Sequence, residues 1–312
     1  MTADELVVVG EQGVPFSKGL MAQAFMATGL APEQAYSVAA AVERSEKRRG
    51  HTAVSRSQLR TIARRTLGPA EGDLLIERID QWQSLRRNEV PVVILIGGAT
   101  GVGKSTLATQ LAHRLGITRV ASTDMVRQVM RAFFARDLMP TIHASSFDAG
   151  QPVQVPGPGS SELSRTGFVD QTKAVSVGVG ALIERSVAEA HSVVIEGVHI
   201  VPGFLDLSRW PEALIVPFVL AVGDRDRHRG HFAVREYETA GIRPLRRYVE
   251  HFAQIRRIQK YIVACAEEQG VPVIENESLD VCVKEVLERV LAAVGEYRRP
   301  VTPPQGASSP AP

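Results

Sequence analysis

The stretch that decides the fold of this chain covers residues 91–105 and reads PVVILIGGATGVGKS. Its first part, residues 91–96, is a short continuous apolar run, which is typical of a strand buried on both faces of a parallel sheet. Its second part, residues 98–105, fits the pattern G-x-x-x-x-G-K-[ST]. After it, Leu107, Leu111 and Leu115 recur at helical spacing. The sequence therefore predicts a strand, a glycine-rich loop and a helix, in that order.

The glycine-rich loop has the composition that binding of phosphate groups requires. Its glycines allow backbone N–H groups to curl around an anion, and the helix N-terminus adds partial positive charge. We therefore expect a Walker A loop, in which Lys104 contacts the β- and γ-phosphates of ATP and the Ser105 hydroxyl binds Mg²⁺. The predicted nucleotide-binding residues are Gly98, Ala99, Thr100, Gly101, Val102, Gly103, Lys104, Ser105 and Thr106. A glycine-rich turn without a ligand is the structural alternative.

The composition is that of an ordinary globular protein. The 312 residues are enough for one large domain or two, and the net charge of +2 indicates neither a nucleic-acid nor a membrane partner. Cys265 and Cys282 lack metal-ligand spacing and are expected to be buried, reduced thiols. Asp4 and Glu5 stand where a signal peptide would be basic, and no apolar run reaches ~18 residues. We therefore expect a cytoplasmic protein.

Four parts are predicted along the chain. Residues 1–67 form a small, mainly helical domain with a short strand at 7–9, and residues 68–90 form a connector helix. Residues 91–297 alternate strands and helices, which predicts an α/β domain with a parallel sheet flanked by helices. Further strands are expected at 118–122, 192–196, 213–222 and 271–274, and helices at 124–136, 171–190, 245–268 and 279–297. Residues 141–167 are expected to be irregular, and the Pro/Ser-rich tail 298–312 disordered.

Asp124 follows the second predicted strand of the α/β domain directly. Ligands of parallel sheets bind at the carboxyl ends of the strands, so Asp124 is expected to face the γ-phosphate. There it can accept a proton from an acceptor hydroxyl or hold a Mg²⁺-bound water. Arg127 and Arg131 lie on one face of the following helix, where they can grip an anionic acceptor. A simple helix cap is the alternative role of Asp124, and the two roles are compatible.

Glu196 ends the third predicted strand. An acidic residue in this position is typical of a Walker B element, which reaches Mg²⁺ through water. His199 follows three residues later and is a candidate contact for the acceptor, although a histidine at a strand end is also commonly structural.

The segment after the fourth predicted strand, Asp224 to His231, is the densest charged stretch of the chain. Small kinases with a Walker A loop carry a lid in this place, where arginines neutralise charge on the transferring phosphoryl group. Arg227 and Arg229 are the candidate catalytic residues, with Arg235 as a further one, and the sequence does not choose among them. The alternative is a solvated helix face with local ion pairs.

Two groups of motifs carry a resemblance to the 2-phosphoglycerate kinase family. The first group is Ile94–Thr106, Leu115–Ile117, and Ser122–Asp124 with Arg127 and Arg131; the second is Val194–His199 with Val201–Gly203. Pro140-Thr141 and Ser145–Phe147 are also similar, and the resemblance covers roughly residues 90–290. The N-terminal part resembles an ATP-cone, a small regulatory nucleotide-binding module, through residues 7–9, Gly13, 14–18 and 29–30.

The resemblance implies transfer of the γ-phosphoryl group of ATP to the 3-hydroxyl of 2-phosphoglycerate. It makes Lys104 and Ser105 ligands of ATP and Mg²⁺, Asp124 the candidate base, and Arg127 and Arg131 the residues that hold the small anionic, phosphorylated substrate. Two alternatives stay open. The acceptor of the kinase is another phosphorylated polyol, sugar or inositol phosphate, or the chain is an ATP-sensing switch without metabolic turnover.

Overall fold

The computed structural model describes residues 6–7, 17–49, 54–87, 90–151, 160–238 and 245–297. The predicted tail 298–312, most of the insertion between residues 150 and 161, and residues 8–9 of the first predicted strand lie outside these ranges.

The described residues of the N-terminal part form four helices and a two-stranded ribbon. The helices are α1 (Lys18–Ala27), α2 (Pro32–Arg49), α3 (Arg56–Leu67) and α4 (Pro69–Arg87), and β1 (Leu6–Val7) pairs antiparallel with β2 (Val54–Ser55). Helix α3 begins at Arg56, because the Ser55 hydroxyl accepts from the Gln58 amide and the Gln58 side chain accepts from the Ser55 amide. Gly29 follows α1 with a φ of 91°, which a side chain would disfavour.

Helix α4 covers most of the predicted connector and also belongs to the N-terminal core. Its Leu75 and Ile76 are fully buried in a cluster with Phe25 of α1 and Leu59 of α3. Apolar packing thus holds the middle of α4 against α1 and α3.

The α/β domain contains a five-stranded parallel sheet, as predicted. The strands are β3 (Val92–Gly97), β4 (Arg119–Ser122), β5 (Val193–Glu196), β6 (Leu214–Ala221) and β7 (Val273–Glu275), in the spatial order β4-β5-β3-β6-β7. All four pairings are parallel, and Ile96 of β3 lies opposite Glu196 of β5 and Phe218 of β6. Strand β3 is buried along its whole length, as expected of a central parallel strand.

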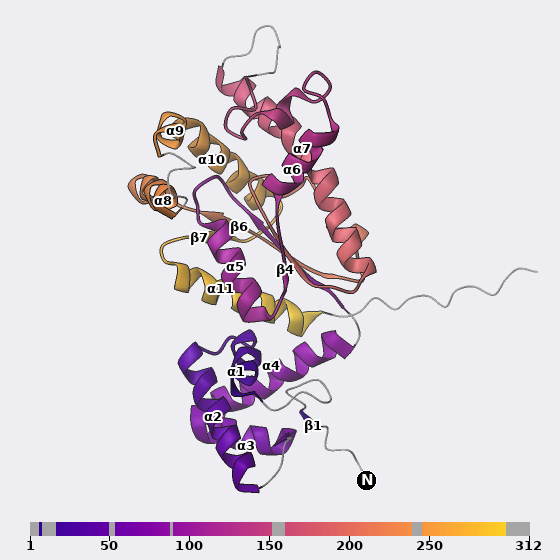
Figure 1. Ribbon diagram of the computed structural model, residues 1–312, viewed down its shortest axis with the longest axis vertical. Coiled ribbons are helices and arrows are strands. Elements are labelled where there is room, and N and C mark those ends of the chain that lie inside the picture. The colour runs from indigo at the N-terminus through magenta and orange to yellow at the C-terminus, as the bar shows by residue number, and fades with distance from the viewer. Residues whose placement is uncertain are drawn as a thin grey trace, which may run out of the picture.

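Helices cover both faces of this sheet (Figure 1). They are α5 (Lys104–Leu115), α6 (Thr123–Phe133), α7 (Ser160–Ala188), α8 (Arg225–Glu238), α9 (Leu245–Glu250), α10 (Phe252–Glu268) and α11 (Leu279–Glu296), with short 3₁₀ turns at Pro140–His143 and Leu207–Arg209. Alternate residues of β3 point to opposite faces. Ile94 joins a cluster with α5 and α11, whereas Val93 joins one with α7.

Two helices differ from the sequence prediction. Helix α7 begins at Ser160, so residues 160–167 are helical and not irregular, and Phe168 near its start is fully buried against Tyr261 of α10. The predicted helix over 245–268 is divided at His251, whose Nε2 lies 3.0 Å from Asp148. In both places tertiary contacts override local preference.

The N-terminal part packs against the end of the α/β domain that lies opposite the glycine loop (Figure 1). Gln23 of α1 donates to the carbonyl of His113 in α5, and Trp82 of α4 donates to the carbonyl of Ala27 while packing against the core of the α/β domain. Helices α5 and α11 therefore touch the N-terminal helices.

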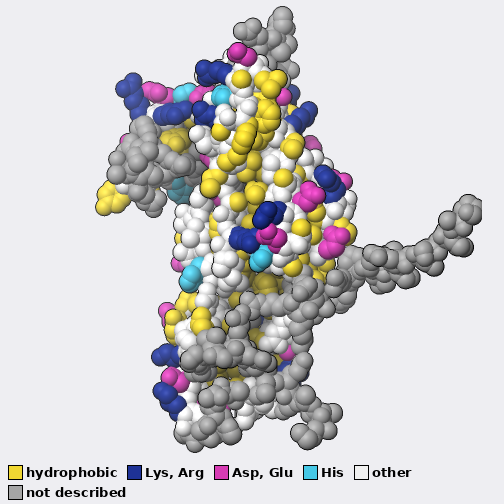
Figure 2. All heavy atoms as spheres, turned by 45° about the vertical axis from the view of Figure 1, so that its right-hand side comes forward, with side chains coloured by type: hydrophobic (Ala, Val, Ile, Leu, Met, Phe, Trp, Pro, Cys, Tyr) yellow, Lys and Arg dark blue, Asp and Glu magenta, His cyan; other side chains and the backbone are white. Residues whose placement is uncertain are grey.

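Hydrophobic side chains also gather on the outside, in a streak at the end of the molecule that carries α6 and α7 (Figure 2). Met125, Val129 and Phe133 of α6 are 65%, 59% and 80% exposed.

Of the two thiols, Cys282 is buried as expected, whereas Cys265 is only partly buried, and both are free. Among the described residues, no helix is long and apolar enough to cross a membrane.

Candidate active site

The glycine-rich loop connects β3 to α5, and its backbone requires glycine at three places. Gly98, Gly101 and Gly103 have φ values of 137°, 85° and 92°, all in the region that side chains disfavour. At Gly98 a Cβ atom would also lie 2.3 Å from the carbonyl oxygen of Leu220. The glycines therefore permit a tight loop that lies close to β6 and opens toward the N-terminus of α5.

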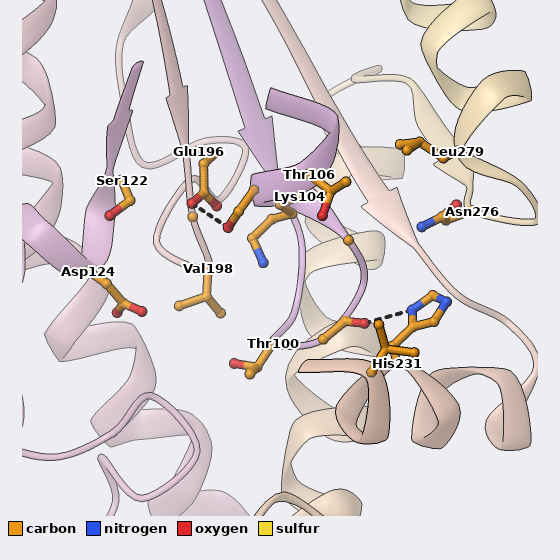
Figure 3. A pocket seen from close by; sticks show the side chains of 15 residues that line it. Thr100, Lys104, Thr106, Ser122, Asp124, Glu196, Val198, His231, Asn276 and Leu279 are labelled. Atoms are coloured by element: carbon orange, nitrogen blue, oxygen red, sulfur yellow. Dashed lines mark hydrogen bonds between the residues drawn. The ribbon is translucent and has the colours of Figure 1, made fainter. Parts of the chain in front are cut away.

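A cavity of about 510 Å³ lies over this loop (Figure 3). Asp124 and Ser122 lie on one side of the loop, and Asn276 and Leu279 lie on the other. The lining residues are Thr100, Gly101, Gly103, Lys104, Ser105, Thr106, Ser122, Asp124, Glu196, Gly197, Val198, His231, Val234, Asn276 and Leu279. The cavity is thus long enough to run from the start of α6 to the start of α11, with the loop between them.

Lys104 lies in the middle of this cavity. Its ammonium donates to the carbonyl of Ala99 at 2.7 Å, which folds the side chain back over the loop. Burial lowers the pKa of Lys104, while the nearby carboxylates of Glu196 and Asp124 act in the opposite direction. An ammonium group buried at the glycine-rich loop is well suited to bind an anion.

Ser105 and Glu196 meet beside the loop. The Ser105 hydroxyl donates to Glu196 Oε1 at 2.8 Å, and Glu196 is only 7% exposed. Parallel pairing of β5 with β3 brings the two residues together. Two oxygen ligands on one side fit Mg²⁺, which binds through one or two side chains and completes its shell with water and phosphate oxygens. The described residues contain no group of three or more His, Cys, Asp or Glu suited to hold a metal by themselves.

Asp124 occupies the first turn of α6 and faces the cavity. Its side chain is 62% exposed. The cap of α6 is a different residue, Ser122, whose hydroxyl accepts from the amide of Met125 at 3.2 Å. Asp124 is therefore free of the capping role that its position in the sequence also suggested.

The two arginines of α6 differ in the residues that they contact. Arg127 has one nitrogen 3.5 Å from Asp124, and its other terminal nitrogen donates to the carbonyls of Ile142 and Ala144. Arg131 donates to Gln128, and neither arginine is among the residues that line the cavity. The structure thus brings Arg127, but not Arg131, beside Asp124.

His199 does not reach the cavity, in contrast to the expectation from sequence. It is fully buried, with Nδ1 2.9 Å from Thr123 Oγ1 and Nε2 2.9 Å from Gln171 Oε1. Burial lowers the pKa of His199 to about 3, so the ring is neutral. Because the amide of Gln171 donates to the carbonyls of Thr141 and Ala144, its oxygen accepts from Nε2 and the hydroxyl of Thr123 donates to Nδ1. His199 therefore joins the start of α6 to α7 and the loop before it.

Helix α8 forms the side of the cavity that was predicted as a lid. His231 and Val234 line it, and Arg227 lies one turn before His231 on the same helix face. Arg229 points elsewhere, since its guanidinium lies over the ring of Phe252, with 4.8 Å to the centroid, and near Asp226. The structure thus separates two arginines that the sequence left equivalent.

Seven cavity residues were not predicted as site residues: Ser122, Gly197, Val198, His231, Val234, Asn276 and Leu279. The first three belong to the motifs that carry the family resemblance. Asn276 follows the last strand directly, at the carboxyl edge of the sheet, and that position was a usable signal. His231 was part of the charged segment but was not singled out. Val234 and Leu279 are ordinary apolar residues that only the fold brings to the site.

Curated relatives of the chain are similar over most of its length. The 2-phosphoglycerate kinase of Methanothermobacter thermautotrophicus is 40% identical and that of Thermococcus kodakarensis 38%; the alignments cover 84% and 91% of this chain, and 85% and 95% of the relatives. The chain belongs to the 2-phosphoglycerate kinase family. The enzyme of Methanopyrus kandleri, 37% identical over 89% of this chain, agrees with this membership. As a member of this family, the chain is an ATP-dependent kinase.

Two other comparisons add nothing to this membership. No model of a protein family matches the chain. A solved structure of a candidate kinase from Chloroflexus aurantiacus covers 65% of this chain and 98% of its own length at 15% identity, with a TM-score of 0.35. The assignment to the 2-phosphoglycerate kinase family therefore stands on the sequence relatives.

Proposed function

We propose that this kinase transfers the γ-phosphoryl group of ATP to the 3-hydroxyl of 2-phosphoglycerate and so forms 2,3-diphosphoglycerate. The observation that carries the proposal is that Lys104, Ser105, Glu196 and Asp124 line the same cavity. The first three suit the triphosphate and its ion, and the fourth lies where a hydroxyl acceptor would approach. The names of the relatives support the choice of acceptor.

ATP fits the cavity in one direction. Its phosphates would lie on the amides of the loop and on Lys104, because these supply the positive charge. The base would then extend toward Asn276, Leu279 and Val234, where apolar and amide groups line the wall. Ser105 and Glu196 would hold Mg²⁺, which neutralises charge on the phosphate oxygens.

Asp124 would act on the acceptor. An exposed carboxylate at the end of the cavity can accept the proton of the attacking hydroxyl and orient its oxygen toward the γ-phosphorus. Arg127, which lies beside Asp124, would bind the carboxylate or phosphate of the substrate. Arg131 would add to the positive charge of the same helix. His199 would not contact the substrate; it would hold Thr123, and through it the neighbouring Asp124, in position.

Arg227 is the better candidate for the lid arginine. It shares a helix face with His231, which lines the cavity, whereas Arg229 is stacked on Phe252. A cation near the γ-phosphate would stabilise the charge that spreads over the transferring group.

The N-terminal part is proposed to act as an ATP-cone-like regulatory domain. Its contact with α5, the helix that begins at the loop, supports this role. A shift of α1 would move the C-terminal end of α5, to which Gln23 donates a hydrogen bond.

The acceptor is tested by release of ADP in the presence of different hydroxy compounds. The panel contains 2-phosphoglycerate, 3-phosphoglycerate, glycerol phosphates, sugar phosphates and inositol phosphates, with Lys104→Ala as the background. We expect the highest kcat/KM with 2-phosphoglycerate. A higher value for another compound would replace the acceptor and keep the kinase; turnover that no acceptor stimulates would favour a regulatory switch.

A further inference from the structure

Three consecutive carbonyl groups of the nucleotide loop accept hydrogen bonds from side chains outside the loop. His228 Nε2 lies 2.9 Å from the carbonyl oxygen of Thr100, and His231 Nδ1 lies 2.9 Å from that of Gly101. Asn276 Nδ2 donates to the carbonyl of Val102, also at 2.9 Å. Since a carbonyl oxygen only accepts, each histidine nitrogen carries the proton and donates. Figure 3 shows His231 and Asn276 on the side of the loop away from Asp124.

The contacts of His228 fix both its charge and its tautomer. It is fully buried and stacked on Phe232, and burial lowers its pKa to about 4, so the ring is neutral. With Nε2 donating to the loop, Nδ1 accepts from Arg256 at 3.4 Å. Arg256 also donates to the carbonyls of Val222 and Gly223 at the end of β6. The bond to Thr100 is thus anchored through Arg256 to the central sheet.

The loop and its three donors pack so closely that side chains on the loop would not fit. A Cβ atom at Gly101 would lie 2.3 Å from the Phe232 ring, and one at Gly103 would lie 2.6 Å from the Asn276 amide nitrogen. The glycines of the loop therefore serve two purposes: they permit the backbone angles and they admit α8 and Asn276 to the carbonyl side.

The direction of a carbonyl fixes the direction of the next amide. In a planar trans peptide, the C=O of one residue and the N–H of the next point in opposite directions. A donor that holds the carbonyls of Thr100, Gly101 and Val102 from outside therefore turns the N–H groups of the three following residues toward the inside of the loop. The inside is where a phosphate would lie.

We propose that His228, His231 and Asn276 are positioning residues that shape the nucleotide loop, by holding its carbonyls so that the amides of Gly101, Val102 and Gly103 point at the bound phosphates. Two of the three belong to α8, which also carries Arg227. The nucleotide loop and Arg227 are thereby fixed to the same helix, α8, and the loop does not need to reorganise when ATP binds. The proposal rests on the proposed function only in taking ATP as the ligand of the loop.

Paired substitutions separate the hydrogen bond from the packing. The amide nitrogen of asparagine can replace Nδ1 of histidine, and that of glutamine can replace Nε2, so His231→Asn and His228→Gln keep the donor. His231→Leu and His228→Leu remove it. His191→Leu is the matched control, because His191 is exposed after α7 and its ring lies 3.7 Å from Glu189, far from the nucleotide loop in the sequence.

The readout is the Kd of a non-hydrolysable ATP analogue with Mg²⁺, measured by calorimetry without acceptor, together with the KM values of both substrates. We expect each leucine variant to raise the Kd and the KM for ATP about tenfold, the donor-keeping variants to stay within about threefold of wild type, and the KM for 2-phosphoglycerate to change little. His191→Leu should bind like wild type.

Equal binding by the leucine variants and wild type would overturn the proposal, and so would equal losses in the leucine and donor-keeping variants. If His228→Leu does not fold, the His231 pair decides, because His231 is partly exposed. A wild-type protein that binds no nucleotide would instead refute the proposed function. The two failures are therefore distinguishable.

Discussion

At the scale of single residues, the two arginines of α8 give the sharpest contrast. Arg227 and Arg229 are two positions apart, equally charged and both exposed, but only Arg227 shares the helix face of His231. We expect Arg227→Ala to lower kcat about 100-fold or more, as loss of a group that stabilises the transferring phosphoryl does, and Arg229→Ala to change it less than about fivefold. Steady-state kinetics with saturating ATP check this. A larger loss in Arg229→Ala would reverse the assignment.

The buried histidines make the protein sensitive to acid. The pKa values of His199 and His228 in the folded chain, about 3 and about 4, lie below the unfolded value of about 6.5. The unfolded chain therefore binds more protons below pH 6.5, and stability is lost as the pH falls through this window. We expect each histidine to remove about 1 to 2 kcal/mol between pH 7 and pH 5.

Urea denaturation of wild type and His228→Gln at pH 7, 6 and 5 measures this effect. Glutamine does not titrate, so the variant should lose less stability than wild type over the same interval. Parallel losses in the two proteins would show that folding does not lower the pKa of His228.

The sequence predicted those site residues that lie in a recognisable loop pattern or directly at the end of a strand. Lys104, Ser105, Asp124 and Glu196 line the cavity as expected, because the loop pattern and strand ends locate them directly. His199 was expected in the cavity but is buried, since the fold places Gln171, 28 residues away in sequence, against its ring. No local pattern reports such a contact.

At the scale of elements, the turn after β5 shows how one glycine positions α6. Gly197 has a φ of 156°, and a Cβ atom there would lie 1.8 Å from Thr123 Oγ1 in the first turn of α6. We expect Gly197→Ala to lower the free energy of unfolding by roughly 2 kcal/mol or more and to impair turnover, because Thr123 must move and Asp124 moves with it.

Gly230→Ala is the matched control for that substitution. Gly230 lies inside α8 with open space around it, so alanine should stabilise the helix by about 0.5 to 1 kcal/mol. Both variants are compared by urea unfolding. A Gly197→Ala protein as stable as wild type would show that the contact with Thr123 relaxes freely.

The order of strands and helices was predictable from periodicity, but their ends and exposed faces were not. Helix α7 extends eleven residues before the predicted start, where packing of Phe168 outweighs the Gly/Ser-rich composition. In α6, Met125, Val129 and Phe133 recur at the spacing of a buried face, yet this face is exposed. Periodicity reports that a helix has an apolar side, and it does not report what covers that side.

At the scale of the whole molecule, Trp82 joins the two parts of the chain. Its ring packs on the core of the α/β domain and its nitrogen donates to Ala27 of the N-terminal part. We expect wild type to unfold in one calorimetric transition. Trp82→Phe should lower stability by about 1 kcal/mol through loss of the hydrogen bond, and Trp82→Ala should separate the transition into two. Two transitions in the wild-type protein would contradict this coupling.

The complete site also belongs to this scale. Its residues come from the ends of four parallel strands and from four helices, α5, α6, α8 and α11, and the cavity exists only because the sheet brings these ends to one edge. The motifs predicted the donor side of the reaction. The wall near Asn276 and the carbonyl contacts of α8 depend on chain segments more than 120 residues apart.

The most direct test of donor and acceptor together is phosphorus NMR of the reaction of ATP, Mg²⁺ and 2-phosphoglycerate with the wild-type protein and with Lys104→Ala. We expect ADP and a second phosphate ester on carbon 3 of the glycerate to appear together in equal amounts, with no product from the folded Lys104→Ala variant. ADP without the new ester, or the same product from Lys104→Ala, would contradict phosphoryl transfer at this loop.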